Sequence, residues 1–316
     1  MKPTSSQPEV IRPASTGDAA SLAPLTWASY RSLLSLADPE ERRLCRPCAV
    51  AAWDGDRPVG LALSAVTPGR PLEEGEQTLL SLVVARPWRR RGLALRLLAA
   101  LEDALPALGV ARLGASYSSR LPAAAAFAAT LRAAGWPEPE ATRLRICGAV
   151  RDTVAVFRNR DSLLARLQAD GFRLWSWRQR GVEAEALART LIDRGEAPAW
   201  AQPQHWSGTL DPDLSLVIGG ADGMVAGWAL CVHQPALARW FFPVGWVRPP
   251  YDRRGWLMGT YAAGAERVAE RHGGDAVAVI ETASEQAGMW RLFERRFQPH
   301  AHWTDRMMAS ARRLNL

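Results

Sequence analysis

The clearest pattern of hydrophobic and polar positions in the first half of the chain is that of a short strand followed by a helix. Residues 79–84 form an apolar, partly β-branched run, which predicts a buried strand. From Gly92 onward, leucines recur at helical spacing and predict an amphipathic helix with one buried face. Those leucines are Leu93, Leu97, Leu98 and Leu101. Strand and helix are joined by an arginine-rich turn that ends in glycine.

This strand, turn and helix predict a site for an anion. The first N–H groups of a helix have no partner within the helix, and the helix dipole places positive potential at the same point. Arg89, Arg90 and Arg91 add charge beside it, while Gly92 lets the backbone approach a phosphate closely. The segment contains neither Gly-x-Gly-x-x-Gly nor Gly-Lys-Ser/Thr, the patterns of dinucleotide and nucleoside triphosphate loops. We therefore expect a pyrophosphate of another ligand class.

The turn resembles a motif of the GNAT superfamily, the acyl-coenzyme A N-acyltransferases. Residues 89–94 read Arg-Arg-Arg-Gly-Leu-Ala, which is similar to the family's Arg/Gln-x-x-Gly-x-Gly/Ala. Residues 10–22 resemble its first strand and helix, and residues 52–63 form a hairpin with Asp-Gly at the turn. Residues 124–136 resemble its late helix, so the resemblance covers nearly all of residues 8–150.

The resemblance implies an α/β fold in which a mixed, mostly antiparallel sheet is flanked by helices. It also implies acetyl-CoA, or another acyl-CoA, as co-substrate, with no metal. The residues expected to hold the coenzyme are Leu82, Val83, Val84, Arg89, Arg90, Arg91, Gly92, Leu93 and Ala94.

The second half repeats the first in a weakened form. Residues 247–258 align with residues 84–95 through a proline, an aromatic residue, two arginines and a glycine. Asp252 stands at the position of Arg89, where a carboxylate would repel a pyrophosphate, and Leu257 replaces the small Ala94. We expect two tandem GNAT-like domains: residues 1–155 bind acyl-CoA, and residues 156–316 are a degenerate copy that is structural or binds the acceptor.

The chemistry that the family implies requires an oxyanion donor, a base and an acid. Backbone N–H groups around residues 82–84 are the expected donors. The family's usual base falls on Thr78 here, so Glu76, two residues earlier on the same strand face, is the candidate base. The family's tyrosine acid falls on Leu131, which leaves Tyr117 as the candidate acid. Proton transfer through water, with no dedicated residue, stays open.

Composition narrows the class of protein. The chain has 316 residues, is 48% hydrophobic and 22% charged, and carries a net charge of +7. The excess positive charge is concentrated around residues 86–96, which favours a phosphate-bearing small ligand over nucleic acid. No apolar run is long enough to cross a bilayer and the N-terminus is not a secretory signal, so we expect a cytoplasmic bacterial protein without membrane or nucleic-acid partners. Cys45 and Cys48 have the Cys-x-x-Cys spacing, but no second pair or nearby histidine completes a metal site.

Three functions fit these observations. The first is acyl-CoA-dependent N-acylation of a primary amine on a small molecule or peptide, by direct attack of the amine on the thioester. The second is a peptide-tailoring acyltransferase that takes longer acyl chains. The third is a non-catalytic protein that binds and senses acyl-CoA.

Overall fold

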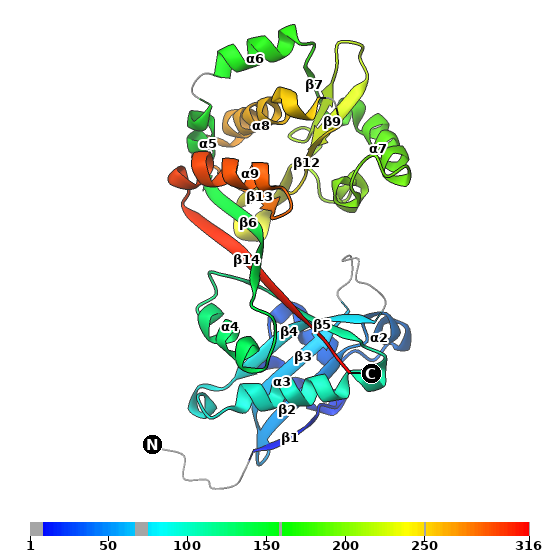
Figure 1. Ribbon diagram of the computed structural model, residues 1–316, viewed down its shortest axis with the longest axis vertical. Coiled ribbons are helices and arrows are strands. Elements are labelled where there is room, and N and C mark those ends of the chain that lie inside the picture. Colours follow the sequence, from blue (N-terminus) through cyan, green and yellow to red (C-terminus); the bar gives the residue numbers. More distant parts are fainter. Residues whose placement is uncertain (1–8, 67–74, 158–159, 250, 316) are drawn as a thin grey trace. The chain divides into compact units, whose positions relative to one another are not determined.

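The computed structural model describes residues 9–66, 75–157, 160–249 and 251–315. It divides into two compact units, of which the first comprises residues 1–142 with 307–316 and the second residues 143–306. Figure 1 shows the elements of both units, and each unit is described by itself below.

The first unit is built on one sheet in the order β1-β2-β3-β4-β5-β14. Its strands are β1 (Val10–Pro13), β2 (Cys48–Asp54), β3 (Arg57–Ala65), β4 (Glu76–Val84), β5 (Arg112–Ser118) and β14 (Trp303–Arg313). Within this order only β4 and β5 are parallel. Its helices are α1 (Ala19–Leu22), α2 (Pro39–Cys45), α3 (Leu93–Ala104) and α4 (Ala124–Ala133). The expected mixed, mostly antiparallel sheet flanked by helices is confirmed.

Two hydrophobic cores cover the two faces of this sheet. On one face, which we call the α3 face, Leu97, Leu98 and Leu101 of α3 are fully buried against residues of β2 to β5. On the opposite face, Leu22 of α1 and Leu34 pack on apolar residues of β2 and β3. The leucine spacing therefore predicted the buried side of α3 correctly, and Figure 1 shows this helix lying along the sheet.

The compact units differ from the domain boundary expected from the sequence. The strand β6 (Glu140–Ala149) begins in the first unit and continues into the second, and β14 leads back from the second unit into the first. Residues 307–313 pair antiparallel with β5 along its whole length. The last strand of the chain thus completes the N-terminal sheet, whereas the division at residue 155 left it in the second half.

The second unit contains a strand group β6-β13-β11-β10 and a four-stranded group β12-β9-β8-β7. Its strands are β7 (Arg173–Ser176), β8 (Leu216–Gly219), β9 (Val225–Ala229), β10 (Val232–Gln234), β11 (Arg239–Phe242), β12 (Gly245–Val247) and β13 (Val277–Ala283). Its helices are α5 (Val150–Val156), α6 (Arg160–Ala169), α7 (Trp177–Asp193), α8 (Trp256–His272) and α9 (Ala287–Leu292).

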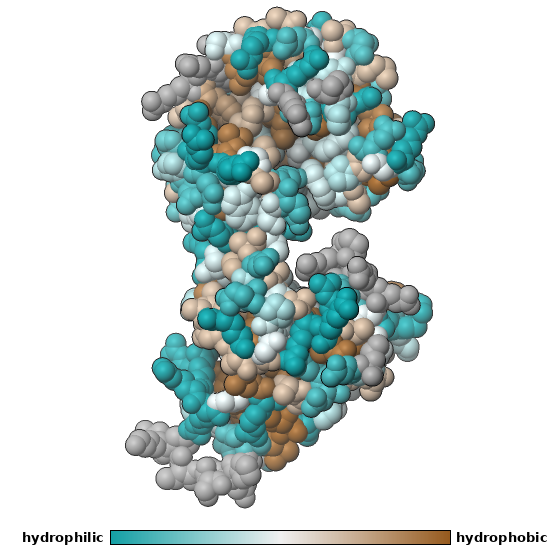
Figure 2. Space-filling view, in the orientation of Figure 1, coloured by the Kyte–Doolittle hydropathy of each residue, from teal (hydrophilic) through white to brown (hydrophobic). Residues whose placement is uncertain are grey.

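The surface mixes hydrophilic residues with small hydrophobic patches over both units on the face that Figure 2 presents. Among the described residues, no helix is both long and apolar enough to cross a membrane.

Candidate functional site

Strands β4 and β5 part halfway along their length. Their parallel pairing runs only from Glu76 opposite Arg112 to Leu79 opposite Ala115. Just beyond, the pairing of β4 with β3 shifts by one residue, because Leu63 faces Ser81 while Ser64 faces Leu79. This irregularity is a β-bulge, which bends the strand and increases its twist. The second half of β4 therefore diverges from β5 and leaves an edge without a partner strand.

Backbone alternation identifies which groups of β4 face that open edge. The N–H of Ala85 donates to Val59 of β3, at 2.8 Å from nitrogen to oxygen. Because N–H directions alternate along a strand, Val83 also faces β3, whereas Leu82 and Val84 face away from it. Two of the three strand residues expected from the sequence thus present their N–H groups to the opening.

The turn after β4 holds the start of α3 open. Arg90 and Gly92 both have left-handed backbone, with φ of 62° and 74°. The first bond within the helix runs from the N–H of Arg96 to the carbonyl of Gly92, so the four preceding N–H groups have no partner inside the helix. A Cβ atom placed on Gly92 would meet no atom within 4 Å. The helix start therefore offers free donors next to open space.

The three arginines of the turn are exposed, and one of them supports the strand. The Nε of Arg89 donates to the carbonyl oxygen of Val84 at 2.8 Å, across the turn. This bond satisfies one carbonyl at the open edge of β4 and holds the turn against the strand. Trp88 anchors the same turn, because its indole is buried in the α3-face core and the guanidinium of Arg57 lies 5.1 Å from its ring centre. Among the described residues, no hydrogen bond or ion pair holds the guanidinium groups of Arg90 and Arg91, so both are available to an anion.

Tyr117 lies on the wall opposite the open edge of β4. It follows Ala115, the last residue of β5 paired with β4, and is only 7% exposed. Its ring packs edge-on against Phe127 of α4, with ring centres 4.8 Å apart. Burial raises the pKa of its phenol, so the hydroxyl keeps its proton at neutral and moderately alkaline pH. The sequence-predicted acid thus stands on the part of β5 that has parted from β4, with its ring in the α3-face core.

Glu76 is not brought to this opening. It stands at the start of β4, where the strands are still paired, and its carboxylate accepts a bond from the guanidinium of Arg112. Leu80, the first residue past the pairing, is four residues away, which is about 13 Å along a strand. Glu76 does lie on the same strand face as Thr78, as expected, but a direct proton transfer at the opening is out of its reach.

Glu76 instead lines a groove that the sequence did not reveal. Most of its lining residues lie on the face opposite α3, because Leu79 and Leu113, which alternate with them, belong to the α3-face core. Gln77, Ala115 and Ser310 also line the groove. The groove has a cavity volume of about 130 Å³. Its lining includes Glu76, Thr78, Arg112, Gly114, Ala309 and Ala311. Two of these residues come from β14, which is remote in sequence, so no local pattern could have identified the groove.

A buried hydroxyl pair was also missed. The hydroxyls of Thr26 and Ser81 lie 2.7 Å apart, and both residues are less than 9% exposed. Ser81 follows the bulge in β4, and Thr26 precedes the 3₁₀ turn Ala28–Leu34. The bond ties that segment to the point where the strands part. Fifty-five residues separate the partners, and an isolated threonine or serine gives no sequence signal.

The corresponding turn in the second unit has the same backbone but a different environment. Gly255 has φ of 81° and precedes α8, as Gly92 precedes α3. Here, however, α6 packs over the helix start: a Cβ on Gly259 would lie 2.4 Å from Leu167, and one on Gly255 would contact Leu163. Trp256 is fully buried and stacks on Tyr251, with ring centres 4.5 Å apart. Bulky side chains therefore fill the space at the start of α8, whereas the corresponding space at the start of α3 is open.

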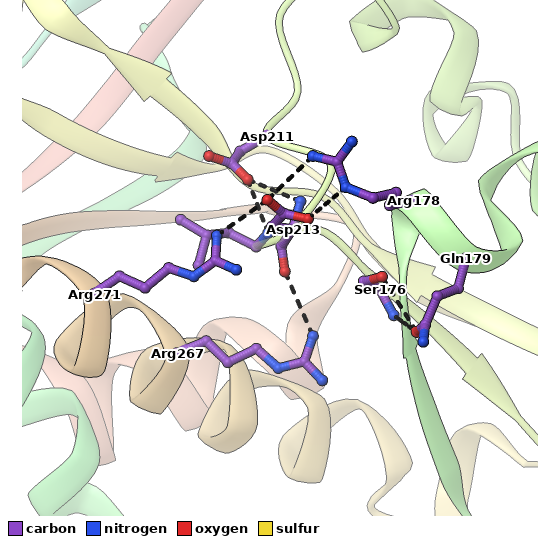
Figure 3. Close-up of polar contacts among 8 residues, drawn as sticks. Ser176, Arg178, Gln179, Asp211, Asp213, Arg267 and Arg271 are labelled. Carbon is purple, nitrogen blue, oxygen red and sulfur yellow. Dashed lines mark hydrogen bonds and ion pairs between the residues drawn. The ribbon is translucent and has the colours of Figure 1, made fainter.

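A polar cluster around Asp213 in the second unit is structural (Figure 3). The carboxylate of Asp213 accepts from Arg178 at 2.8 Å and pairs with Arg271 at 3.3 Å. These guanidinium groups lower its pKa to about 2. The stabilisation is therefore present above the unfolded carboxyl's pKa of about 3.9 and is lost as the pH falls through about 2. Asp211 accepts from the N–H groups of Asp213 and Leu214. The cluster fastens the loop before β8 to α7 and α8.

Cys45 and Cys48 are both free thiols and half-buried. Burial raises the pKa of the Cys48 thiol to about 11, so it stays protonated at neutral pH. A protonated thiol is neither a nucleophile nor a metal ligand.

Comparison with known proteins agrees with this geometry. Residues 19–131 match the acetyltransferase (GNAT) family. No curated protein sequence matches the chain. Several similar solved structures cover almost all of it at low sequence identity.

One is the GCN5-related glucosamine N-acetyltransferase region of a fungal multi-domain β-N-acetylglucosaminidase, with a TM-score of 0.65, 12% identity and 97% of this chain covered. The chain spans 38% of that protein's length. A tandem GNAT protein from the clavulanic acid biosynthesis pathway has a TM-score of 0.55 and 16% identity, covering 98% of this chain and 99% of the other. A GCN5-related N-acetyltransferase from Sphaerobacter thermophilus has a TM-score of 0.55 and 14% identity, covering 98% of this chain and 96% of the other.

At these sequence identities the likeness concerns the fold alone. The parted strands, the open helix start and the family match together lead to one conclusion: residues 19–131, in the N-terminal half of the chain, form a domain that matches the acetyltransferase (GNAT) family.

Proposed function

We propose that the chain transfers an acetyl group from acetyl-CoA to a primary amine of a small molecule or peptide, and that the first unit carries this reaction. The observation that supports it most is the combination of an open strand edge and an unobstructed helix start. Leu82 and Val84 lie at one end of the same turn, and Gly92 with the free N–H groups of α3 at the other.

In this proposal the pyrophosphate is held by the N–H groups at the start of α3, with Arg90 and Arg91 beside it. Leu93 and Ala94 supply two of those N–H groups, and Arg89 keeps the turn in place through its bond to Val84. The N–H of Leu82 or Val84 stabilises the oxyanion that forms when the amine attacks the thioester carbonyl. Val83 supports this edge indirectly, through its pairing with β3.

The proton route uses water and Tyr117. Only the neutral amine attacks, and an amine with a pKa of about 10 is mostly protonated at neutral pH. Since Glu76 is held at the far end of the groove, water is the proposed acceptor of the amine's proton. Tyr117, protonated and next to the opening, is the proposed donor to the departing thiolate.

Titration calorimetry with coenzyme A tests the binding step. We expect one site per chain, because α6, Trp256 and Tyr251 fill the space at the start of α8 while the start of α3 is open. Two equivalent sites would contradict this assignment.

Release of free thiol from acetyl-CoA in the presence of amines then separates the candidate functions. Binding without amine-dependent thiol release would favour the sensing protein, and a strong preference for long acyl chains would favour the peptide-tailoring enzyme.

Replacing Tyr117 by phenylalanine is expected to lower kcat by at least about tenfold, since a general acid contributes ~10²- to 10⁴-fold. Coenzyme A affinity should stay the same, because the ring that packs against Phe127 is retained. In the unchanged enzyme, the raised pKa of Tyr117 should keep kcat free of any loss from this group until well into the alkaline range. Tyr30→Phe, a tyrosine on the opposite face, is the matched control. Equal kcat for both variants would remove Tyr117 from the mechanism.

Replacing Glu76 by glutamine is expected to lower kcat less than tenfold, because the structure places its carboxylate about 13 Å before the parting of the strands. A true general base is worth ~10²- to 10⁴-fold at neutral pH. The measurement is kcat as a function of pH for both proteins. If Glu76→Gln lowered kcat by that factor at neutral pH, and by less at high pH where the amine loses its proton unaided, Glu76 would be restored as the base.

A further inference from the structure

A row of three charged residues lies at one end of the groove, where Glu76 and Arg112 line it and Arg313 is the next residue in the row. Strand register places Glu76 beside Arg112, and Arg112 beside Arg313 of β14. Neighbours across strands share a face and lie close together. Arg112 donates to Glu76, and the row carries one net positive charge. Among the described residues Arg313 is in no ion pair, so this end of the groove is suited to one more anion.

The two arginines are unfavourable neighbours unless an anion accompanies them. Like charges directly opposite on adjacent strands destabilise a sheet. Glu76 offsets part of this repulsion through Arg112, and its side chain is 14% exposed while that of Arg112 is 47% exposed. A guanidinium fork matches a carboxylate in shape as well as charge. A ligand carboxylate is therefore the group that this end would hold best.

The groove leads from these charges toward the parting of β4 and β5. Its floor is made of small residues, with Gly114 on β5 and Ala309 and Ala311 on β14. From Arg112 to Ser116, the first residue of β5 past the pairing, the strand rises about 13 Å. An arginine side chain can extend along the groove and shorten this span. A ligand with about 10 Å between its ends, the length of an extended tripeptide, would bridge the two points.

We propose that the acceptor is a short, extended amine that carries a carboxylate about 10 Å from its nucleophilic nitrogen, as a tripeptide does. Arg313 and Arg112 hold the carboxylate, the small residues accommodate an extended backbone, and the amine reaches the opening between β4 and β5. This inference rests on the proposed acetyl transfer. An α-amino acid, whose amine and carboxylate are attached to one carbon, is too short to bridge the span.

The test compares triglycine, triglycinamide and glycine as acceptors with the full-length protein and acetyl-CoA, by thiol release. We expect kcat/KM for triglycine to exceed that for triglycinamide by about tenfold, the value of a charge-assisted bond at an exposed site. Glycine should be a poor acceptor. Equal use of the acid and the amide would overturn the proposal, and so would a preference for glycine.

Three variants locate the effect. In Arg313→Gln, kcat/KM for triglycine should fall close to that for triglycinamide. Arg313→Lys should restore part of the preference for triglycine. Gly114→Val should block triglycine, because its new side chain points into the groove while its Cβ meets only the carbonyl oxygen of Gln77, at 3.8 Å. That variant has no strained φ and should fold. Arg43→Gln, on exposed α2, is the control for removing a surface arginine.

Binding measurements on the same samples separate this inference from the proposed function. If coenzyme A binds and thiol is released equally fast with triglycine and triglycinamide, the proposed acetyl transfer is supported and the proposed carboxylate site is overturned. If coenzyme A does not bind but calorimetry shows triglycine binding that depends on Arg313, the carboxylate site stands and the acetyl transfer falls. If coenzyme A binds and neither peptide binds nor reacts, the carboxylate proposal is overturned.

Discussion

Replacing Gly92 by glutamate is expected to abolish coenzyme A binding. Gly92 has φ of 74° and its Cβ position meets no atom within 4 Å, so the new carboxylate would enter the open space at the start of α3. There it would take up the free N–H groups as an internal anion, which the helix dipole favours, and would repel a pyrophosphate. Calorimetric titration of coenzyme A measures the loss.

Gly109→Glu is the matched control for this variant. Gly109 has φ of 71° and equally open surroundings, and it lies past the other end of α3. Both substitutions therefore carry the same cost of about 1 to 2 kcal/mol for a side chain in left-handed backbone. We expect Gly109→Glu to bind coenzyme A normally. An unchanged dissociation constant in Gly92→Glu would mean that the helix start does not hold the ligand.

Deleting residues 307–316 is expected to unfold the first unit, although these residues are the last of the chain. The deletion removes the strand that pairs with β5 from Arg112 to Ser118. It also removes Arg312, which donates to the carbonyl of Ala134 and pairs with Glu102, a carboxylate that also accepts from Trp136. Seven ladder positions at about 1 kcal/mol per bond are comparable with the whole stability of a small domain.

Thermal denaturation followed by circular dichroism, together with coenzyme A titration, measures this effect. A deletion of only residues 315–316 leaves the strand intact and is the control. A fragment of residues 1–155, the domain expected from the sequence, should be unstable for the same reason, and a peptide of residues 303–316 added to it should restore structure. A stable fragment that binds coenzyme A without the peptide would show that β14 is dispensable.

Local interactions explain why the sequence was sufficient for the coenzyme turn. The β-branched run of β4, the left-handed glycine and the leucine face of α3 are close together in the chain, and each follows its own backbone preference. Their order alone places free N–H groups at the end of a buried strand. The same reasoning located the second copy of the turn at Gly255, although the packing of α6 over α8 came only from the structure.

The outcome for the two candidate catalytic residues depended on strand register. Both Glu76 and Tyr117 lie on strands that the sequence predicted. Their distance from the reacting end depends on where β4 and β5 stop pairing, after Leu79 and Ala115. A bulge is set by contacts with the neighbouring strand, which periodicity along one strand does not contain.

The sequence by itself thus determined the elements and the family pattern of the N-terminal half, because those are encoded over a few neighbouring residues. Only the tertiary structure decided that β14 completes the first sheet, that Arg313 lies beside Arg112, and that small residues from β5 and from β14, the last strand of the chain, form one groove. These features join residues about two hundred positions apart. Such pairings are chosen by the burial and hydrogen bonding of the whole sheet, since an unpaired β5 edge is costlier than the long connection that brings β14 to it.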